Sequence, residues 1–284
     1  MFPNKKKPKR NNGFSVLMSV YAKETPERLK TALDSVLYSS IQPTEVVLVQ
    51  DGPIGIELLK IINQSSKVIT IKHVILKNNM GLARALNEGL KHISTQFVFR
   101  ADSDDFNCSN RFSKQLKVLK RGYDLVGSSV LEKDSNGRPT SIKKVPTNSS
   151  DIVKYLKIRN PFNHMTVAFR HSFVSRLGGY PNIHLREDYA LWALFLAKNA
   201  RVCNIDEVLV EASAGSEMYQ RRGGFRLLVS EYQIQCLLVR LKFQSIYGGI
   251  CTWFIKVPFY LSPAFLRGFL YKKFLRENLP NSRM

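Results

Sequence analysis

Short apolar segments alternate with amphipathic helical segments over the first 120 residues of this 284-residue chain. The apolar segments are rich in β-branched and aromatic residues and are bounded by turn-forming residues, as is typical of buried strands. We expect strands at residues 14–21, 45–50, 68–76 and 96–101, and helices from Pro26 and over 56–63, 81–92 and 111–120. This alternation predicts βαβ units and a mostly parallel, doubly wound α/β sheet. Beyond residue 120 we expect strands over 124–132 and 165–169 and an apolar helix over 187–198.

Polar side chains follow three of these strands. Tyr21 ends the first strand, Asp51 ends the second, and Asp102, Asp104 and Asp105 follow the fourth. Open parallel sheets bind ligands beyond the carboxyl ends of their strands. The sequence therefore predicts one crevice in which these residues converge.

Three carboxylates occupy four positions in the segment Asp102-Ser103-Asp104-Asp105. Like charges this close repel one another and need compensation from a cation. A divalent ion such as Mg²⁺ or Mn²⁺, held by one or two carboxylates and by substrate phosphates, would fit them. The alternative is an acidic turn in which Asp105 or Asn107 caps the following helix, and the segment alone leaves both open.

The formal net charge of +21 lies mostly in the flanks of the chain. Residues 1–10 carry five Lys or Arg and no acid, and residues 219–284 carry eleven against Glu231 and Glu277. A nucleic-acid-binding protein more often places such charge on a folded face with aromatic residues, so we expect no nucleic acid partner. Basic flanks beside an apolar C-terminal region favour attraction to an anionic membrane surface. Residues 1–12 by themselves are typical of a disordered basic tail.

The C-terminal region contains two apolar runs, residues 243–255 and 257–266, which Lys256 separates. Pro258 and Pro263 are expected to break the second run. Neither run reaches the ~20 residues that a helix needs to cross a bilayer. We therefore expect helices that lie in the membrane interface, with a helical appendage packed on the core as the alternative.

The cysteines and the N-terminus bear on localisation. The four cysteines contain no C-x-x-C pair, so neither a zinc knuckle nor a disulfide framework is indicated and a reducing compartment fits best. The N-terminus has no apolar segment typical of a secretory signal. We expect a cytoplasmic protein, peripheral on the inner face of the cell membrane. The cysteines are Cys108, Cys203, Cys236 and Cys251.

Six motifs in consecutive order carry a family resemblance. They are FSVLMSVY, VVLVQDGP, NNMGLARALNEGL, FVFRADSDD, NPFNHMTVAFR and GGYPNIHLREDYALW, and the later run RRGGFRLLVSEYQ is also similar. On these motifs, residues 14–215 resemble the family 2 glycosyltransferases, which are inverting enzymes of the Rossmann-like GT-A fold. The likeness is closest to the bacterial capsule, exopolysaccharide and O-antigen branch. Two departures are the absence of a proline beside Tyr21 and the presence of Arg100 before the DXD motif.

The resemblance implies a division of the chain. Residues 13–218 would form the GT-A domain, with a nucleotide-sugar-binding half at 13–106 and an acceptor-binding half at 107–218. Residues 219–284 would form a basic, apolar, helical extension. The implied reaction transfers a sugar from a nucleoside diphosphate, with UDP favoured, to a glycan or lipid-linked glycan in polysaccharide biosynthesis.

The resemblance also implies roles for single residues. Asp104 would bind Mn²⁺ or Mg²⁺, and Asp102 would share the metal or bind the ribose. Asp51 would bind the nucleobase, and Tyr21 and Arg84 would lie on the donor side. The general base would be Asp188 with support from Glu187, whereas a helix N-terminus that favours acidic residues is the alternative for this pair. The candidates with less defined roles are His164, Asp105 and Arg100.

Two other functions fit parts of the sequence. A nucleotidyltransferase that makes nucleotide-sugars would need a glycine-rich loop after the first strand, but residues 22–26 contain no glycine. A basic, non-enzymatic nucleic-acid-binding protein would have no use for the acidic cluster. The identity of the sugar, the acceptor and the linkage depends on loops between residues 134 and 186, and the sequence leaves it open.

Overall fold

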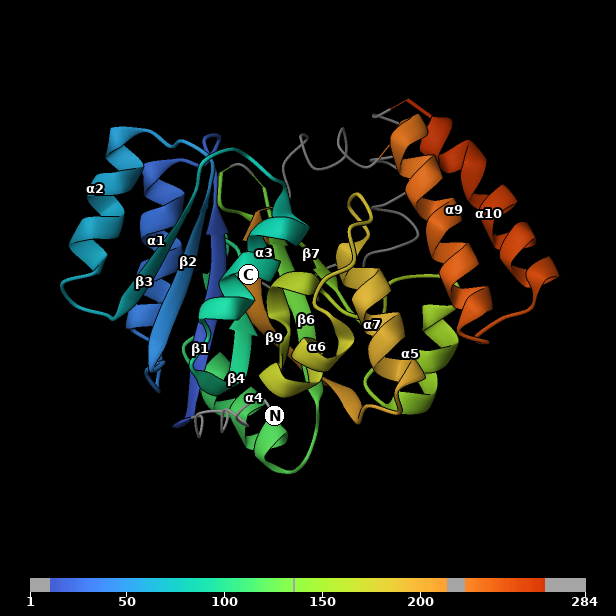
Figure 1. Ribbon diagram of the computed structural model, residues 1–284, viewed down its shortest axis with the longest axis horizontal. Helices are drawn as coiled ribbons and strands as arrows, with labels where there is room; N and C mark the ends of the chain where they lie inside the picture. Colours follow the sequence, from blue (N-terminus) through green and yellow to red (C-terminus); the bar gives the residue numbers. More distant parts are fainter. Residues whose placement is uncertain (1–10, 135, 214–222, 264–284) are drawn as a thin grey trace, which may run out of the picture.

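The computed structural model describes residues 11–134, 136–213 and 223–263 (Figure 1). The expected basic tail therefore lies almost wholly outside the described residues, as does the expected domain boundary at 218. Strand β1 begins at Asn11, two residues before the expected start of the folded domain.

The centre of the molecule is a nine-stranded sheet in the order β3-β2-β1-β4-β8-β6-β9-β5, with β7 paired to β6. Its first half is parallel and consists of β1 (Asn11–Val20), β2 (Glu45–Asp51), β3 (Ile71–Leu76) and β4 (Thr95–Arg100). The second half mixes parallel and antiparallel pairs: β5 (Phe106–Asn107), β6 (Leu125–Lys133), β7 (Pro139–Lys143), β8 (Ala168–Arg170) and β9 (Val202–Ser213). The predicted α/β class is thus confirmed, and the parallel arrangement is confined mainly to the first half.

Helices cover both faces of the sheet (Figure 1). One core contains Val16 and Met18 of β1, and the other contains Leu17, because successive side chains of a strand point to opposite faces. The first core is covered by α1 (Pro26–Leu37), α2 (Ile56–Ser65) and α4 (Arg111–Lys120). The second is covered by α3 (Leu82–His92), α5 (Ser149–Leu156), α6 (His171–Leu177), α7 (Glu187–Ala197) and α9 (Phe225–Arg240).

Two expected segments differ in the structure. The strand expected from residue 68 begins at Ile71, because a turn follows α2. The strand expected at 165–169 is instead a short 3₁₀ helix, His164–Thr166, followed by β8.

The C-terminal region corrects a third expectation. A single helix, α10 (Ile246–Leu261), runs through both Lys256 and Pro258, where two broken segments were expected. Lys256 lies within the helix, as a good helix former can, and its ammonium group pairs with Glu231 of α9 at 2.5 Å. Helices α9 and α10 lie side by side at one end of the molecule, with α10 on the outside (Figure 1). Among the described residues, no helix is both long and apolar enough to cross a bilayer.

Candidate active site

The carboxyl ends of β2, β1 and β4 lie next to one another, as the sequence predicts. Val20 of β1 pairs with Gln50 of β2, and Leu17 of β1 pairs with Arg100 of β4. The backbone N–H of Ala101 continues this pairing by donating to the carbonyl of Leu17 at 3.0 Å. The segments that follow these strands therefore begin at one edge of the sheet.

The three aspartates after β4 form a compact acidic cluster. Asp102, Asp104 and Asp105 each offer a carboxylate oxygen, and these oxygens lie within 4.8 Å of one another. Asp105 is buried, and its Oδ2 has no hydrogen-bond partner among the described residues. Because a buried carboxylate oxygen is costly without a partner, the position of Asp105 fits a cation ligand better than a helix cap. In the structure Asn110 is the N-cap residue of α4.

The electrostatics of the cluster show an excess of negative charge. Burial, together with the charges of Asp102 and Glu24, raises the pKa of Asp104 to about 6. Burial and the neighbouring aspartates raise the pKa of Asp105 well above its usual range. Glu24, which the sequence analysis overlooked, belongs here because its carboxylate accepts a hydrogen bond from Ser103. Hard oxygen ligands with surplus negative charge are the donor set that Mg²⁺ or Mn²⁺ prefers.

Arg100 is the cation that the chain itself places beside the cluster. Its side chain is only 1% exposed and forms an ion pair with Asp102. Its Nε has no hydrogen-bond partner among the described residues. A second buried arginine, Arg111, donates to the carbonyl oxygen of Arg100 at 2.6 Å. One guanidinium in direct contact leaves most of the charge of three carboxylates uncompensated, so the residues present fit a divalent cation.

Asp51 fixes the loop that leads into α3. Its two carboxylate oxygens accept hydrogen bonds from the backbone N–H groups of Met80, at 2.6 Å, and Gly81, at 3.0 Å. The chain approaches this loop so closely at Gly52 that a Cβ there would lie 2.6 Å from the backbone nitrogen of Asn79, and Gly52 has φ of +87°. Glycine is therefore required beside Asp51.

Two other donor-side candidates lie near this edge with accessible side chains. Tyr21 directly follows β1 and is 36% exposed. Arg84 lies on the first turns of α3, whose N-terminus Asp51 holds, and its side chain is exposed. No contact of the described residues tests their predicted roles, so nucleotide binding by Tyr21, Asp51 and Arg84 remains a prediction.

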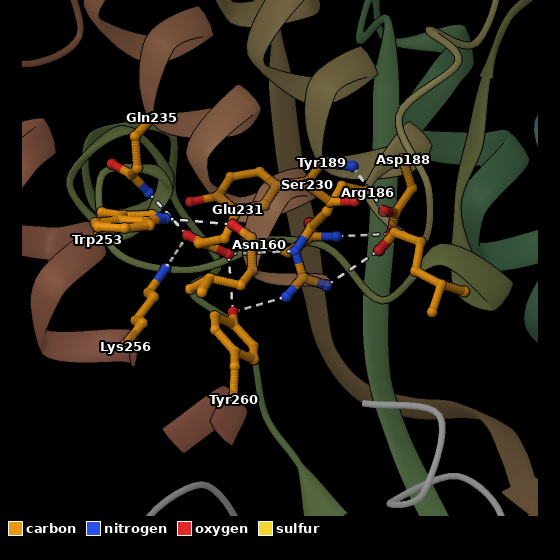
Figure 2. A network of polar contacts seen from close by, with 12 residues as sticks. Asn160, Arg186, Asp188, Tyr189, Ser230, Glu231, Gln235, Trp253, Lys256 and Tyr260 are labelled. Atoms are coloured by element: carbon orange, nitrogen blue, oxygen red, sulfur yellow. Dashed lines mark hydrogen bonds and ion pairs between the residues drawn. The ribbon is translucent and has the colours of Figure 1, made fainter. Parts of the chain in front are cut away.

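Glu187 and Asp188 open helix α7, as the sequence predicts. One carboxylate oxygen of Asp188 accepts a hydrogen bond from Asn160 at 2.6 Å, and the other accepts from the backbone N–H of Tyr189 (Figure 2). Burial raises the pKa of Asp188, and burial with the charge of Asp188 raises the pKa of Glu187 to about 7. A carboxylate whose pKa is raised by burial is better suited than an ordinary one to accept a proton near neutral pH. Asn160 is a partner that the sequence analysis did not single out, although it opens the NPFNHMTVAFR motif.

His164 and Tyr180 lie together near Glu187 and Asp188. The His164 Nε2 and the Tyr180 hydroxyl are 3.2 Å apart, and both pKa values are shifted toward the neutral form by burial. Asn87 of α3 holds the backbone of Tyr180 through two hydrogen bonds, of 2.7 and 2.8 Å. The positive charge of Arg100 lowers the pKa of Glu187 and that of Asp104, against the effect of burial, so this charge acts on both acidic groups. Tyr180 was missed as a site residue, although it stands in the GGY motif.

A groove of about 490 Å³ opens beside Asp104. This volume is in the range of sites for small-molecule ligands. Its walls come from α1, the ends of β6 and β9, and the turn after β6. The lining residues are Glu27, Arg28, Thr31, Asp104, Phe106, Lys133, Asp134, Gly137, Glu211, Ala212 and Ser213.

Comparison with known proteins decides the family. The family model described as glycosyl transferase family 2 matches residues 15–177, which is more than half of the chain. The chain belongs to glycosyltransferase family 2. It is 40% identical over 94% of its length to a UDP-Gal:α-D-GlcNAc-diphosphoundecaprenol β-1,3-galactosyltransferase of Escherichia coli, of which 98% is covered. It is 35% identical over 92% of its length to the amylovoran biosynthesis glycosyltransferase AmsE of Erwinia amylovora, of which 98% is covered.

A solved structure shows the same fold. Residues 1–349 of Staphylococcus aureus TarS superpose with a TM-score of 0.64 at 19% identity, over 91% of this chain and 74% of that one. The predicted GT-A fold and family resemblance are therefore confirmed, and this family 2 member is a glycosyltransferase. Neither the nucleotidyltransferase nor the nucleic-acid-binding alternative is favoured by these matches.

Proposed function

We propose that this glycosyltransferase moves a hexose from a UDP-sugar to a hydroxyl group of a lipid-linked glycan in polysaccharide biosynthesis. The supporting observation is the 40% identity to the E. coli galactosyltransferase, which extends over nearly the full length of both chains. A likeness this complete includes the acceptor half and the C-terminal helices as well as the nucleotide-binding half. UDP-galactose and a GlcNAc-diphospho-polyprenol are therefore the first donor and acceptor to test.

The donor side of the site would hold a divalent ion and the nucleotide. Asp102, Asp104 and Asp105 would bind Mn²⁺ or Mg²⁺, and such an ion, when bound, neutralises negative charge on the leaving diphosphate. Asp51 would accept a hydrogen bond from the uracil N–H, because each of its engaged oxygens keeps a second lone pair. Arg84 and Tyr21 would contact the nucleotide from the accessible side of the same edge.

The acceptor side would supply the base. The acceptor oxygen attacks the anomeric carbon as the bond from that carbon to the diphosphate oxygen breaks, and the bonding electrons leave with the diphosphate. The acceptor hydroxyl proton passes to the carboxylate of Asp188, which Asn160 keeps oriented. Glu187 would position the acceptor, while His164 and Tyr180 would form the uncharged wall between the two acidic groups.

The substitution Asp188→Asn tests this assignment. We expect the variant to bind UDP-galactose with Mn²⁺ normally, by thermal shift, and to lose transfer by about 10²- to 10⁴-fold, because general-base catalysis contributes that much. Transfer is measured by mass spectrometry of the product formed on a synthetic GlcNAc-diphospho-lipid. Asp151→Asn, at an exposed carboxylate of α5, is the matched control. If Asp188→Asn has an unchanged turnover, the general base is another residue.

We also propose that the outer face of α10 docks on an anionic bilayer. Exposed side chains recur along this face at helical spacing, and on α9 Phe225 and Tyr232 are exposed as well. In both helices Glu231 is the one acidic residue, and it is buried. An exposed apolar face without accessible acids, in a region of high positive charge, matches a surface of acidic lipid headgroups. The exposed residues of α10 are Ile246, Tyr247, Ile250, Cys251, Phe254, Ile255, Pro258 and Leu261.

Vesicle sedimentation tests the membrane proposal. The double substitution Phe254→Ser and Ile255→Ser should weaken binding to phosphatidylglycerol vesicles by ~10-fold or more, since each buried apolar side chain contributes more than 1 kcal/mol. Ile56→Ser removes an equally exposed apolar residue from α2, at the opposite end of the molecule, and should change nothing (Figure 1). Equal binding by all three proteins would refute docking through α10. Equal binding to phosphatidylcholine would refute the role of charge.

A further inference from the structure

A buried ion cluster connects the C-terminal helices to the start of α7. Its centre is Glu231 of α9, which is 1% exposed. The carboxylate receives Lys256 Nζ at 2.5 Å, Arg186 Nε at 3.3 Å, and the Tyr260 hydroxyl and Gln235 Nε2 at 2.8 Å each (Figure 2). We call these five residues the Glu231 cluster. Its members come from α9, α10 and the turn that precedes α7.

Arg186 is the member that reaches the active site. It is the N-cap residue of α7, directly before Glu187 and Asp188. Its Nη2 donates to the Tyr260 hydroxyl at 2.8 Å, and its Nη1 donates to the carbonyl of Leu185 at 3.0 Å. Figure 2 shows the guanidinium between Glu231 on one side and Asp188 on the other.

The backbone of this turn needs support from its surroundings. Leu185 has a φ of +54°, in the left-handed region that residues with a branched side chain rarely adopt. Such a conformation costs about 1–3 kcal/mol and persists only where neighbouring contacts impose it. The bond from Arg186 to the Leu185 carbonyl is one of those contacts, and Glu231 holds the side chain that makes it.

The charge of Arg186 also needs a partner. Without Glu231, the guanidinium would keep its bonds to Tyr260 and Leu185 but lose this buried carboxylate, and its charge lies one or two residues away from two carboxylates that must stay free. Among the described residues, Arg100 from β4, Lys143 from β7, and Asn160 and Tyr180 from the loops also face this pair. Arg186 differs from these because it is adjacent to the pair in sequence, so it is the cation that could most easily fold back onto the pair.

We propose that Glu231 is a positioning residue, which by binding Arg186 fixes the first turn of α7 and keeps a guanidinium away from Glu187 and Asp188. This inference rests on the proposed role of Asp188 as the base. It gives the C-terminal helices a part in the reaction, because α9 carries Glu231 and α10 supplies Lys256 and Tyr260.

Two substitutions with opposite electrostatic effects test the proposal. Glu231→Gln leaves Arg186 without its carboxylate, so the added positive potential should move the acid limb of the kcat–pH profile to lower pH. Arg186→Gln removes the cation, so the limb should move to higher pH. In both variants we expect kcat to fall by ~10- to ~100-fold through misplacement of the base, while KM for the donor stays within about twofold. Glu57→Gln, at an exposed ion pair of α2, is the control.

The outcomes separate this inference from the proposed function. A merely structural role would lower the amount of folded enzyme but would not shift the two pH limbs in opposite directions. If Glu231→Gln does not fold, Arg186→Gln still decides, because Glu231 keeps Lys256 as a counter-ion in that variant. The inference about Glu231 is overturned, and the assignment of the base is kept, if both variants fold with unchanged kcat and unchanged pH profiles while Asp188→Asn is inactive. An active Asp188→Asn enzyme overturns the assignment of the base.

Discussion

Two of the buried acidic sites in this protein are built in opposite ways. At the Glu231 cluster, one carboxylate receives two cations, a hydroxyl and an amide. At the aspartate cluster after β4, three carboxylates lie together, and among the described residues Arg100 alone forms an ion pair with them, through Asp102. The pKa values diverge accordingly. Burial would raise the pKa of Glu231, but Lys256 and Arg186 hold it at about 2, whereas burial and like charges raise that of Asp104 to about 6.

On the proposed function, this difference separates an acid that is fully compensated by the protein's own cations from acids whose charge is kept for a ligand. A buried carboxylate with complete compensation stabilises the fold and needs nothing from outside. Buried carboxylates without it destabilise the fold until a cation arrives, which is the usual compromise at a functional site. Substitutions at the two sites should therefore change stability in opposite directions.

The largest expected effect is at Asp104. Asp104→Asn should lower transfer by about a thousandfold or more, because a metal ion at the leaving diphosphate contributes several kcal/mol. The same substitution should raise the Tm of the metal-free protein, since it removes one of three mutually repelling charges. Transfer assays over a Mn²⁺ titration and thermal unfolding in EDTA measure the two effects. Asp34→Asn, at an exposed pair on α1, is the control.

If Asp104→Asn keeps full activity at low Mn²⁺, Asp104 is not a ligand of the metal. A variant that is inactive but less stable than the parent would show that this aspartate serves the fold, as Glu231 does. Either result would break the contrast between the two sites.

The second effect is at the Glu231 cluster and has the opposite sign. Removing one partner from a buried ion pair typically costs 3–5 kcal/mol, so we expect Glu231→Gln to lower the free energy of unfolding by about that amount. Because the folded pKa of about 2 lies below the unfolded value of 4.5, the stabilisation is complete above pH 4.5 and is lost as pH falls toward 2. Urea unfolding at pH 7 and pH 3 should therefore show a smaller difference between variant and parent at the lower pH. An equal difference at both would contradict the low pKa.

Much of this architecture was accessible from the sequence. Helix α4 has the bounds that its apolar spacing predicts, and β2 and α3 differ from prediction by one residue. The local sequence pattern is enough to locate these segments because their apolar residues are periodic. Parallel pairing of the strands then brings Asp51 and Asp102 to one edge of the sheet. The side-chain pairs that complete the candidate site could not be predicted from the sequence, because their members are far apart along the chain. Asn160 and Asp188 are 28 residues apart.

The C-terminal helices show why the rest could not be predicted. Lys256 and Pro258 read as interruptions in an apolar run, yet α10 continues through both. Lysine is a good helix former, and a lysine within an apolar run is tolerated when its charge has a partner. Here Glu231, 25 residues earlier, receives it. The pairing of two buried charges is a tertiary event that no window of sequence contains.

The smallest expected effect is at Glu187, which resembles the aspartate cluster in lacking compensation. The side chain is 6% exposed, and no cation lies within ion-pair distance among the described residues. Its folded pKa of about 7 lies above the unfolded value of 4.5, so the protein loses stability as pH rises between these values. Glu187→Gln has no charge to bury. It should therefore be more stable than the parent by about 1–3 kcal/mol at pH 8, and equal to it at pH 4.

Unfolding at the two pH values measures this difference, with Glu88→Gln, at an exposed pair on α3, as the control. Glu187→Gln should also lose part of its transfer activity, because a neutral amide oxygen accepts a weaker hydrogen bond from the acceptor hydroxyl than a carboxylate does. A gain in stability together with a loss of activity would place Glu187 with Asp104, among the acids whose charge is kept for the ligand. A loss of stability at pH 8 would instead place it with Glu231, and the contrast would then separate the two carboxylates of a single helical turn.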